Sequence, residues 1–311
     1  MCITLTHLFK PHAVIYRAIA VISLLFVYSV ASVASTIDFP VAPKNTPYKL
    51  VSELAFAEPS AKFSYANEHA DQYAAYWPAI ETANPSNTNN QAKGVVVFIH
   101  GGCWLSAFDM SHAYAFATGL SQAGYHVWSI EYRRAGNGGE WPVALNDITL
   151  GLQKLETLTE MGVDIEHIRI VGHSAGGHLA AMLGLQLVDI LPASVKKADV
   201  IGLAAIIDVE DYANGSNSCQ SATPRFMAGM PEQKPVDYYL ASANNFLAAG
   251  ENLGEFVLLQ GNADTIVPES QAQHQNAKTK ILDGIGHFDW IHPGSDAFKQ
   301  VLLQLEASVK E

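Results

Sequence analysis

The chain has 311 residues, of which 49% are hydrophobic and 15% are charged, a balance typical of a globular protein with a large buried core. Its 30 acidic residues outnumber its 18 lysines and arginines, and the formal net charge is −12. This acidic balance argues against nucleic acid and anionic membrane surfaces as partners, because both attract basic proteins.

Residues 1–34 are predicted to be an export signal rather than part of the fold. Lys10 and Arg17 carry the only fixed side-chain charges there, Ala18–Ala31 is an apolar run, and the Ser-Val-Ala at 32–34 resembles a small-residue cleavage site. A retained membrane anchor is the alternative, although the run is short for a spanning helix. We expect a secreted or periplasmic protein with no stable membrane partner. Its mature part, residues 35–311, would form one domain with a net charge of −14, because two basic residues leave with the signal.

The rest of the chain alternates between strand-like and helix-like segments. Two antiparallel strands and a polar loop are predicted first, at Ala61–Asn67, Gln72–Trp77 and Ala83–Lys93. Further strands are predicted at Val95–Ile99, His126–Glu131, Ile168–Val171, Val200–Ile207, Phe256–Gln260 and Lys280–Leu282. Helices are predicted at Ser111–Ala123, Pro142–Thr157, Gly177–Leu187, Ser270–Lys278 and Ser295–Val309. This order predicts a mostly parallel sheet with helices on both faces.

A glycine pair follows the first buried strand, in the sequence His100-Gly101-Gly102-Cys103-Trp104. Consecutive glycines let backbone N–H groups approach a substrate oxygen closely, as acyl transfer needs where a tetrahedral oxyanion forms. Gly101 and Gly102 are therefore candidate oxyanion-hole donors, and a plain strand-to-helix turn is the alternative. His100 is expected to hold this loop by hydrogen bonds rather than to act as a base.

A serine stands at the centre of Gly172-His173-Ser174-Ala175-Gly176, between a predicted strand and a predicted helix. A tight strand-to-helix turn of this kind projects a serine hydroxyl as a nucleophile, with glycines relieving the crowding on either side. Ser174 is the candidate nucleophile and the N–H of Ala175 a candidate oxyanion donor. An ordinary helix-start serine is the alternative. His173 and His178 are expected to pack or to face solvent.

Candidate acid and base residues follow two later strands, in the order expected after a nucleophilic serine. Asp264 follows the strand near residue 256, and His287 lies in the Gly286-His287-Phe288-Asp289 segment after the last strand. His287 would accept the Ser174 proton, and Asp264 would orient its imidazole. Asp208 and Asp289 remain alternative acids, Asp264 could instead cap the following helix, and His274 and His292 remain alternative bases.

The irregular segment Asp208–Phe246 lies between two strands and is predicted to form a small cap over the site. Arg225 within it could bind a substrate carboxylate, although a solvated surface arginine is favoured. Cys103 and Cys219 are expected to stay unpaired, because one lies in the glycine loop and the other in a polar insertion, even though an exported protein permits disulfides.

These segments together resemble the α/β-hydrolase family, of the carboxylesterase and arylformamidase type. The resemblance covers roughly residues 60 to 310, and its most specific parts are HGGCW (100–104), EYRRAGNGGEWPVALND (131–147), GHSAGGHLA (172–180), GNADTIVP (261–268) and GHFD (286–289). It implies the α/β-hydrolase fold, with an eight-stranded sheet and a small cap. It also implies a triad of Ser174, Asp264 and His287 with an oxyanion hole at Gly101, Gly102 and Ala175. Cys103 departs from the glycine or aromatic residue common at its position.

The expected function is hydrolysis of small-molecule carboxylic esters of small acyl or aryl groups. An arylformamidase acting on a formamide is the alternative, a peptidase is a weaker one, and a non-catalytic binding protein is the alternative from another class. Trp104 and Phe288 flank the proposed site residues and are expected to line an aromatic substrate pocket. No phosphate-binding loop, dinucleotide fingerprint or HExxH zinc motif is found in the sequence, so neither a cofactor nor a metal is expected.

Overall fold

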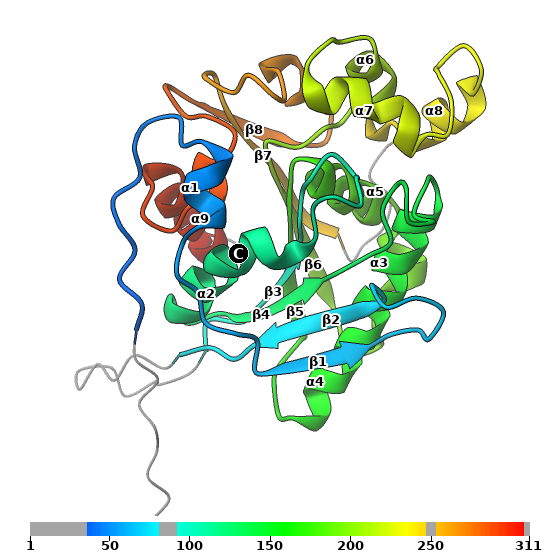
Figure 1. Cartoon of the computed structure of the whole chain (residues 1–311). Coiled ribbons are helices and arrows are strands. Elements are labelled where there is room, and N and C mark those ends of the chain that lie inside the picture. Colours follow the sequence, from blue (N-terminus) through cyan, green and yellow to red (C-terminus); the bar gives the residue numbers. More distant parts are fainter. Residues whose placement is uncertain (1–35, 81–91, 247–252, 308–311) are drawn as a thin grey trace, which may run out of the picture. The chain divides into compact units, whose positions relative to one another are not determined.

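The structure, a computed structural model, describes residues 36–80, 92–246 and 253–307. Its centre is an eight-stranded sheet in the order β1-β2-β4-β3-β5-β6-β7-β8 (Figure 1). The strands are β1 (Ala61–Ser64), β2 (Tyr73–Trp77), β3 (Val95–Ile99), β4 (His126–Ile130), β5 (His167–His173), β6 (Lys197–Leu203), β7 (Leu253–Gly261) and β8 (Lys278–Leu282).

The sheet is antiparallel only at the edge that carries β1 and β2. These two strands pair antiparallel with each other, and β2 pairs antiparallel with β4, whereas all later pairings are parallel. All five residues of β3 are buried, because a central parallel strand is covered on both faces. The predicted α/β-hydrolase fold, with its mostly parallel eight-stranded sheet, is therefore confirmed.

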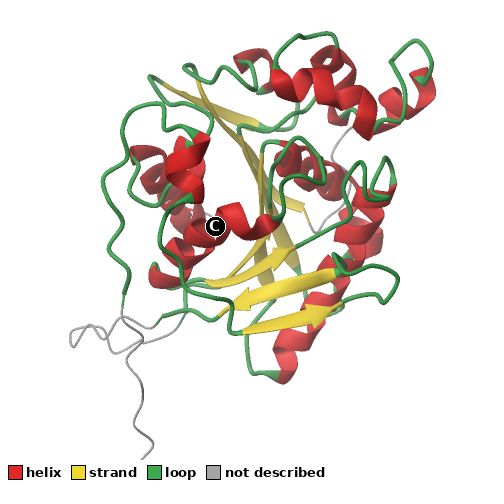
Figure 2. Cartoon of the chain, viewed as in Figure 1, coloured by secondary structure: helices red, strands yellow, loops and turns green. Residues whose placement is uncertain are grey.

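Helices cover both faces of this sheet (Figure 2). One face packs against α3 (Val143–Gln153), α4 (Thr157–Glu160) and α5 (Ala175–Ile190), and the other packs against α1 (Tyr48–Ser52), α2 (Tyr114–Gln122) and α9 (Asp296–Ala307). The buried residues Leu145, Ile148 and Leu152 of α3 recur at helical spacing, which explains why this amphipathic segment folds against the sheet. The short 3₁₀ helices are η1 (Met110–Ala113), η2 (Lys154–Glu156), η3 (Ala243–Asn245), η4 (Glu269–Gln271) and η5 (Asp289–Ile291).

The segment after β6 forms the predicted cap from three short helices, α6 (Val209–Ala213), α7 (Ser218–Phe226) and α8 (Pro235–Ala241). They lie together in the yellow-green part of the chain (Figure 1). Asn217 caps the start of α7 by accepting the N–H of Gln220, whose side chain accepts the Asn217 N–H in return. Arg225 on α7 is exposed, as the sequence analysis favoured.

Several predicted elements have shifted ends in the structure, and two differ from it most. The helix expected at Ser270–Lys278 is absent, because only the η4 turn forms there and Lys278 already begins β8. Polar side chains in this segment bond the backbone instead: Gln271 accepts the N–H groups of Ile207 and Asp208. The strand expected at Val200–Ile207 begins at Lys197 and ends at Leu203, because Ala204 has a left-handed backbone (φ +48°) that cannot continue a strand.

The predicted export signal, most of the predicted 83–93 loop and the last residues of the C-terminal helix lie outside the described residues. Within the described part of the chain, every helix is too short or too polar to cross a membrane.

Candidate active site

Ser174 lies on the sharp turn that joins β5 to α5. Its backbone is left-handed (φ +55°), a conformation that costs a non-glycine residue of order 1 kcal/mol and so marks a locally constrained position. The turn is held by a hydrogen bond from the Ser174 N–H to the Leu203 carbonyl, at 2.9 Å. A Cβ atom added to Gly176 would lie 2.2 Å from the Ile99 carbonyl oxygen, so only glycine lets α5 begin this close to β3.

The Ser174 hydroxyl is buried and has no hydrogen-bond partner among the described residues. A buried polar group without a partner costs about 1–3 kcal/mol, so such groups are uncommon outside functional sites. The hydroxyl lines a cavity that His287 also lines. The structure shows no hydrogen bond between this hydroxyl and the His287 imidazole; catalytic hydrogen bonds are often long or absent before substrate binds.

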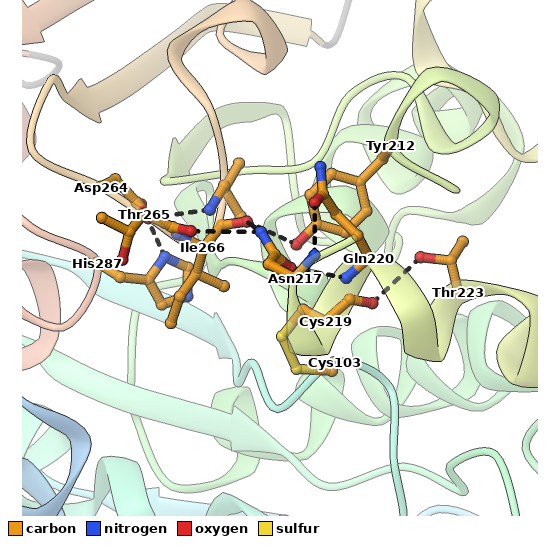
Figure 3. Close-up of a disulfide and its surroundings, with 11 residues drawn as sticks. Cys103, Tyr212, Asn217, Cys219, Gln220, Thr223, Asp264, Thr265, Ile266 and His287 are labelled. Atoms are coloured by element: carbon orange, nitrogen blue, oxygen red, sulfur yellow. Dashed lines mark hydrogen bonds and ion pairs between the residues drawn. A yellow bond between two sulfur atoms is a disulfide. The ribbon is translucent and has the colours of Figure 1, made fainter. Parts of the chain in front are cut away.

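Asp264 and His287 form a buried pair at this cavity (Figure 3). The His287 Nδ1 atom lies 2.7 Å from Asp264 Oδ2, and the two side chains are 5% and 0% exposed. The other Asp264 oxygen accepts the N–H groups of Ile266 and Val267 at 2.8 and 2.9 Å, which fixes the carboxylate in place. Because Nδ1 is engaged, Nε2 is the ring nitrogen left to exchange a proton with a substrate or nucleophile.

The alternative acids are engaged elsewhere. Asp208 caps α6 by accepting the Asp211 N–H at 2.9 Å. Asp289 accepts the N–H groups of Gly286 and Thr46 at 2.7 and 2.8 Å. Neither carboxylate reaches the His287 ring, which Asp264 occupies.

The alternative bases are also engaged elsewhere. His274 contacts the Phe246 carbonyl with Nε2, and His292 accepts the Gly294 N–H with Nδ1. Neither residue lines the Ser174 cavity.

The glycine loop after β3 faces the same cavity. Gly102 and Cys103 line it, whereas Gly101 packs against the nucleophile turn, where an added Cβ would lie 2.9 Å from the His173 carbonyl oxygen. The Trp104 carbonyl accepts the Ala135 N–H at 2.7 Å, which holds the end of the loop. Ala175, the third candidate donor, is the first residue of α5, so its N–H has no acceptor within the helix.

His100 holds this loop by hydrogen bonds, as the sequence predicts. Its Nδ1 contacts the Gly101 carbonyl at 2.8 Å and its Nε2 contacts Glu131 at 3.0 Å. Glu131 is itself buried and also accepts the Met110 N–H at 2.8 Å. Burial and the neighbouring Arg134 lower the pKa of His100 to about 3, so this ring is neutral at ordinary pH.

A disulfide joins Cys103 to Cys219, with Cα atoms 5.1 Å apart, and the prediction that these cysteines stay unpaired is wrong (Figure 3). The two residues are separated by 116 positions, and no local pattern indicates that the cap folds back onto the glycine loop. The cap also contacts the loop that carries Asp264, because Asn217 and Tyr212 both donate to the Ile266 carbonyl, at 2.7 and 2.9 Å. The segment 212–219 therefore ties the glycine loop to the loop that carries Asp264.

The two residues expected to line the substrate pocket lie in different places. Trp104 is fully buried, stacks on Phe226 with ring centroids 4.7 Å apart, and donates its indole N–H to His178 at 3.2 Å. It packs beneath its loop rather than facing the cavity, because its left-handed backbone (φ +55°) turns the side chain into the core under the cap. Phe288, by contrast, lines the cavity beside His287.

The cavity has a volume of about 270 Å³ and a largely apolar wall. Its lining residues are Tyr48, Gly102, Cys103, Phe108, His112, His173, Ser174, Ser218, Cys219, Ile266, His287 and Phe288. Burial lowers the pKa of His112 to about 4 and that of His173 well below its ordinary value, so neither ring carries charge near pH 7. The lining contains no lysine, arginine, aspartate or glutamate, so the cavity suits an uncharged group.

Sequence reasoning missed several of these lining residues. Tyr48, Phe108 and Ser218 come from three segments that carry no motif of their own. Only contacts between distant parts of the chain bring them together, which a local pattern does not encode. A larger cavity of about 500 Å³ lies beside Lys44, Lys280 and Asp296 and contains none of the candidate catalytic residues.

Comparison with known proteins identifies the family. The model of the BD-FAE family matches residues 81–279, more than half of the chain. The chain belongs to the BD-FAE family. It is also 25% identical to esterase LipC of Mycobacterium tuberculosis over 187 residues and 26% identical to esterase LipQ of the same organism over 185 residues. Each match covers 58% of this chain but only 46% and 44% of the relatives, so the chain spans less than half of their length.

Solved structures share the fold at lower identity. Esterase B from Lactobacillus rhamnosis superposes with a TM-score of 0.66 at 17% identity, covering 82% of this chain and 87% of that one. A truncated carbohydrate esterase from gut microbiota superposes with a TM-score of 0.64 at 20% identity, covering 82% of this chain and 98% of that one. These likenesses support the α/β-hydrolase fold of this BD-FAE family member.

Proposed function

We propose that this BD-FAE family member is an exported serine hydrolase that cleaves carboxylic esters of small acyl or aryl groups. The observation that carries the proposal is the Asp264–His287 pair at 2.7 Å, because His287 lines the same cavity as Ser174, whose buried hydroxyl has no partner among the described residues. A nucleophile, a base and an orienting acid in that arrangement are the parts that acyl transfer requires.

In the proposed mechanism, the Ser174 oxygen attacks the ester carbonyl while His287 Nε2 takes the hydroxyl proton. Asp264 holds the imidazole by Nδ1 and stabilises its protonated form. The N–H groups of Gly102 and Ala175 bind the oxyanion, and Gly101 allows the loop to approach the nucleophile turn. The tetrahedral intermediate then collapses, His287 returns the proton to the leaving alcohol, and an acyl-enzyme remains.

Deacylation repeats the sequence with water as the nucleophile. His287 removes a proton from water, the hydroxide attacks the acyl carbonyl, and the proton passes to Ser174 as the acid departs. The products are one alcohol and one carboxylic acid, and the enzyme returns to its starting state. Apart from the substrate and this water, every group in the proposed mechanism belongs to the protein.

The names of the relatives support esters as the substrate class. LipC and LipQ are called esterases, and the structural neighbours are called esterase B and a carbohydrate esterase. The cavity volume of about 270 Å³ and its aromatic wall support small acyl or aryl groups over long lipid chains.

Export is supported by two features. The sequence predicts a signal at residues 1–34, and the Cys103–Cys219 disulfide is typical of proteins that fold in an oxidising compartment. In this proposal the mature protein begins near Ser35 and forms one hydrolase domain. Mass spectrometry of the protein from its native host tests this, because an intact leader in the membrane fraction would indicate an anchor instead.

The activity is tested with a panel of model substrates at equal concentration. Phenyl and nitrophenyl acetates and butyrates should be cleaved far faster than palmitates, and N-formylkynurenine should be a poor substrate. Ser174→Ala should lose on the order of a millionfold in rate. A higher kcat/KM for the formamide would favour an arylformamidase, and equal activity of wild type and Ser174→Ala would contradict the mechanism.

A further inference from the structure

Residues 36–54, here called the N-terminal strap, cross the molecule before the first strand and precede the family match that begins at residue 81. The strap is the dark blue segment that ends in α1 (Figure 1). Its start is held by paired hydrogen bonds with Gln122, whose side chain accepts the Ile37 N–H and donates to the Ile37 carbonyl, both at 2.9 Å. Its end is held by Val51, which is buried in the core.

Asp289 fastens the strap to the loop that carries His287. This buried carboxylate accepts the N–H groups of Thr46 and Asn45 at 2.8 and 3.2 Å, and the N–H of Gly286 at 2.7 Å. The Ala42 N–H also donates to the Gly294 carbonyl at 3.1 Å. The Asp289 side chain thus fixes the strap against the loop that carries His287. A residue of the strap can therefore take a defined place at the cavity.

Tyr48, the first residue of α1, takes that place. Its ring lies 5.4 Å from Phe288, 5.7 Å from Phe108 in an edge contact, and 5.9 Å from His112, measured between centroids. All four residues line the cavity that contains Ser174. The half-buried Tyr48 ring therefore forms a wall that three different elements hold in position.

We propose that Tyr48 is a specificity-determining residue that limits the size of the group accepted beside Ser174; this inference rests on the proposed esterase function. The ring occupies space that a longer acyl or alcohol group would need. Because the strap is anchored at both ends and clamped by Asp289, the wall does not yield freely to a larger substrate. The residue lies outside the family match, so the strap is a feature by which this chain sets its own substrate range.

The test compares kcat/KM for matched pairs of esters in four variants. The acyl pair is nitrophenyl butyrate and octanoate, and the alcohol pair is phenyl acetate and naphthyl acetate. Each buried methylene is worth about fourfold in binding, so Tyr48→Ala should raise the large-to-small ratio of at least one pair by roughly tenfold or more. Tyr48→Phe should keep the wild-type ratios, and Tyr48→Trp should lower the ratio that Tyr48→Ala raises.

Leu50→Ala is the matched control, because Leu50 lies on the same helix but is 42% exposed and does not line the cavity. Its ratios should equal those of wild type. The inference is overturned if both ratios of Tyr48→Ala and of Tyr48→Trp stay within twofold of wild type while wild type cleaves esters. If Tyr48→Ala does not fold, the Phe and Trp variants decide the question by the same ratios. If wild type cleaves none of the esters, the proposed function fails and the inference fails with it.

Discussion

The loops at the carboxyl ends of the parallel strands and the two segments that flank them contribute differently to the site. The loops after β3, β5, β7 and β8 carry the glycine pair Gly101-Gly102, Ser174, Asp264 and His287. The N-terminal strap and the cap supply Tyr48, Ser218 and Cys219 to the cavity wall. The candidate catalytic residues thus come from the loops at the carboxyl ends of the strands, whereas much of the cavity shape comes from the flanking segments.

This difference follows from how each part is held. The Ser174 turn is fixed by residues within a few positions of it and by the neighbouring strand. The flanking segments depend on bonds over long sequence distances, such as Thr46 to Asp289 and Cys103 to Cys219. We infer that substitutions in the loops at the carboxyl ends of the strands affect the chemical step most. Substitutions in the flanking segments affect substrate range and stability.

Replacing Asp264, the candidate acid, should have the largest effect on activity. Asp264→Asn keeps the shape of the side chain but presents the wrong partner to His287 Nδ1, which should lower kcat on the order of ten thousandfold. Asp208→Asn is the control, because asparagine caps a helix as well as aspartate does. Steady-state kinetics on a short-acyl ester measures both. A severe loss in Asp208→Asn with a mild loss in Asp264→Asn would show that Asp208, and not Asp264, is the acid.

Breaking the disulfide should have an intermediate effect, because it frees the cap from the glycine loop. A bridge that closes a long loop typically contributes about 2–4 kcal/mol, so a reducing agent should lower Tm by roughly 5–10 °C. A displaced glycine loop should also lower kcat/KM by about tenfold or more. Differential scanning calorimetry and ester kinetics, with and without reductant, measure these changes.

Cys219→Ala provides the control for this experiment. The variant has no Cys103–Cys219 bridge to lose, so reductant should leave its Tm unchanged. An equal response of wild type and Cys219→Ala to reductant would contradict a stabilising role for this bridge.

Acid should have the smallest effect per group changed, acting through three buried histidines, one of which contacts the cap. Burial lowers the pKa of His100 to about 3, and those of His112 and His178 to about 4, below the ordinary 6.5. The unfolded chain therefore binds protons below pH 6.5 that the folded chain does not. The stability that these groups contribute is complete above pH 6.5 and is lost as the pH falls towards 4.

The loss should be about 2 kcal/mol per histidine between pH 7 and 5, measured by urea unfolding. His178→Gln removes one titrating group, at the ring that contacts the Ala241 carbonyl of the cap. Its stability should fall less than that of wild type over this range. A wild-type stability that does not change between pH 7 and 5 would contradict the assignment of these rings as neutral.

The sequence predicted the mostly parallel eight-stranded sheet well, and the contacts of the flanking segments poorly. The strand at Val95–Ile99 has the predicted bounds, because a continuous run of valine, phenylalanine and isoleucine is typical of a buried parallel strand. The helix expected near Ser270 failed because Gln271 instead bonds the backbone of Ile207, which is 64 residues away in the sequence, and apolar periodicity does not reveal such a contact. The disulfide and the places of Trp104 and Tyr48 depend on which distant segments meet, which local patterns do not determine.

The proposed mechanism requires Ser174 to be the activated nucleophile of this site. The direct measurement is intact-mass and peptide-mapping mass spectrometry after incubation with a fluorophosphonate. Wild type should gain one adduct, located on the peptide that contains Ser174, and Ser174→Ala should gain none. An adduct on a different residue, or equal labelling of the two proteins, would contradict the account.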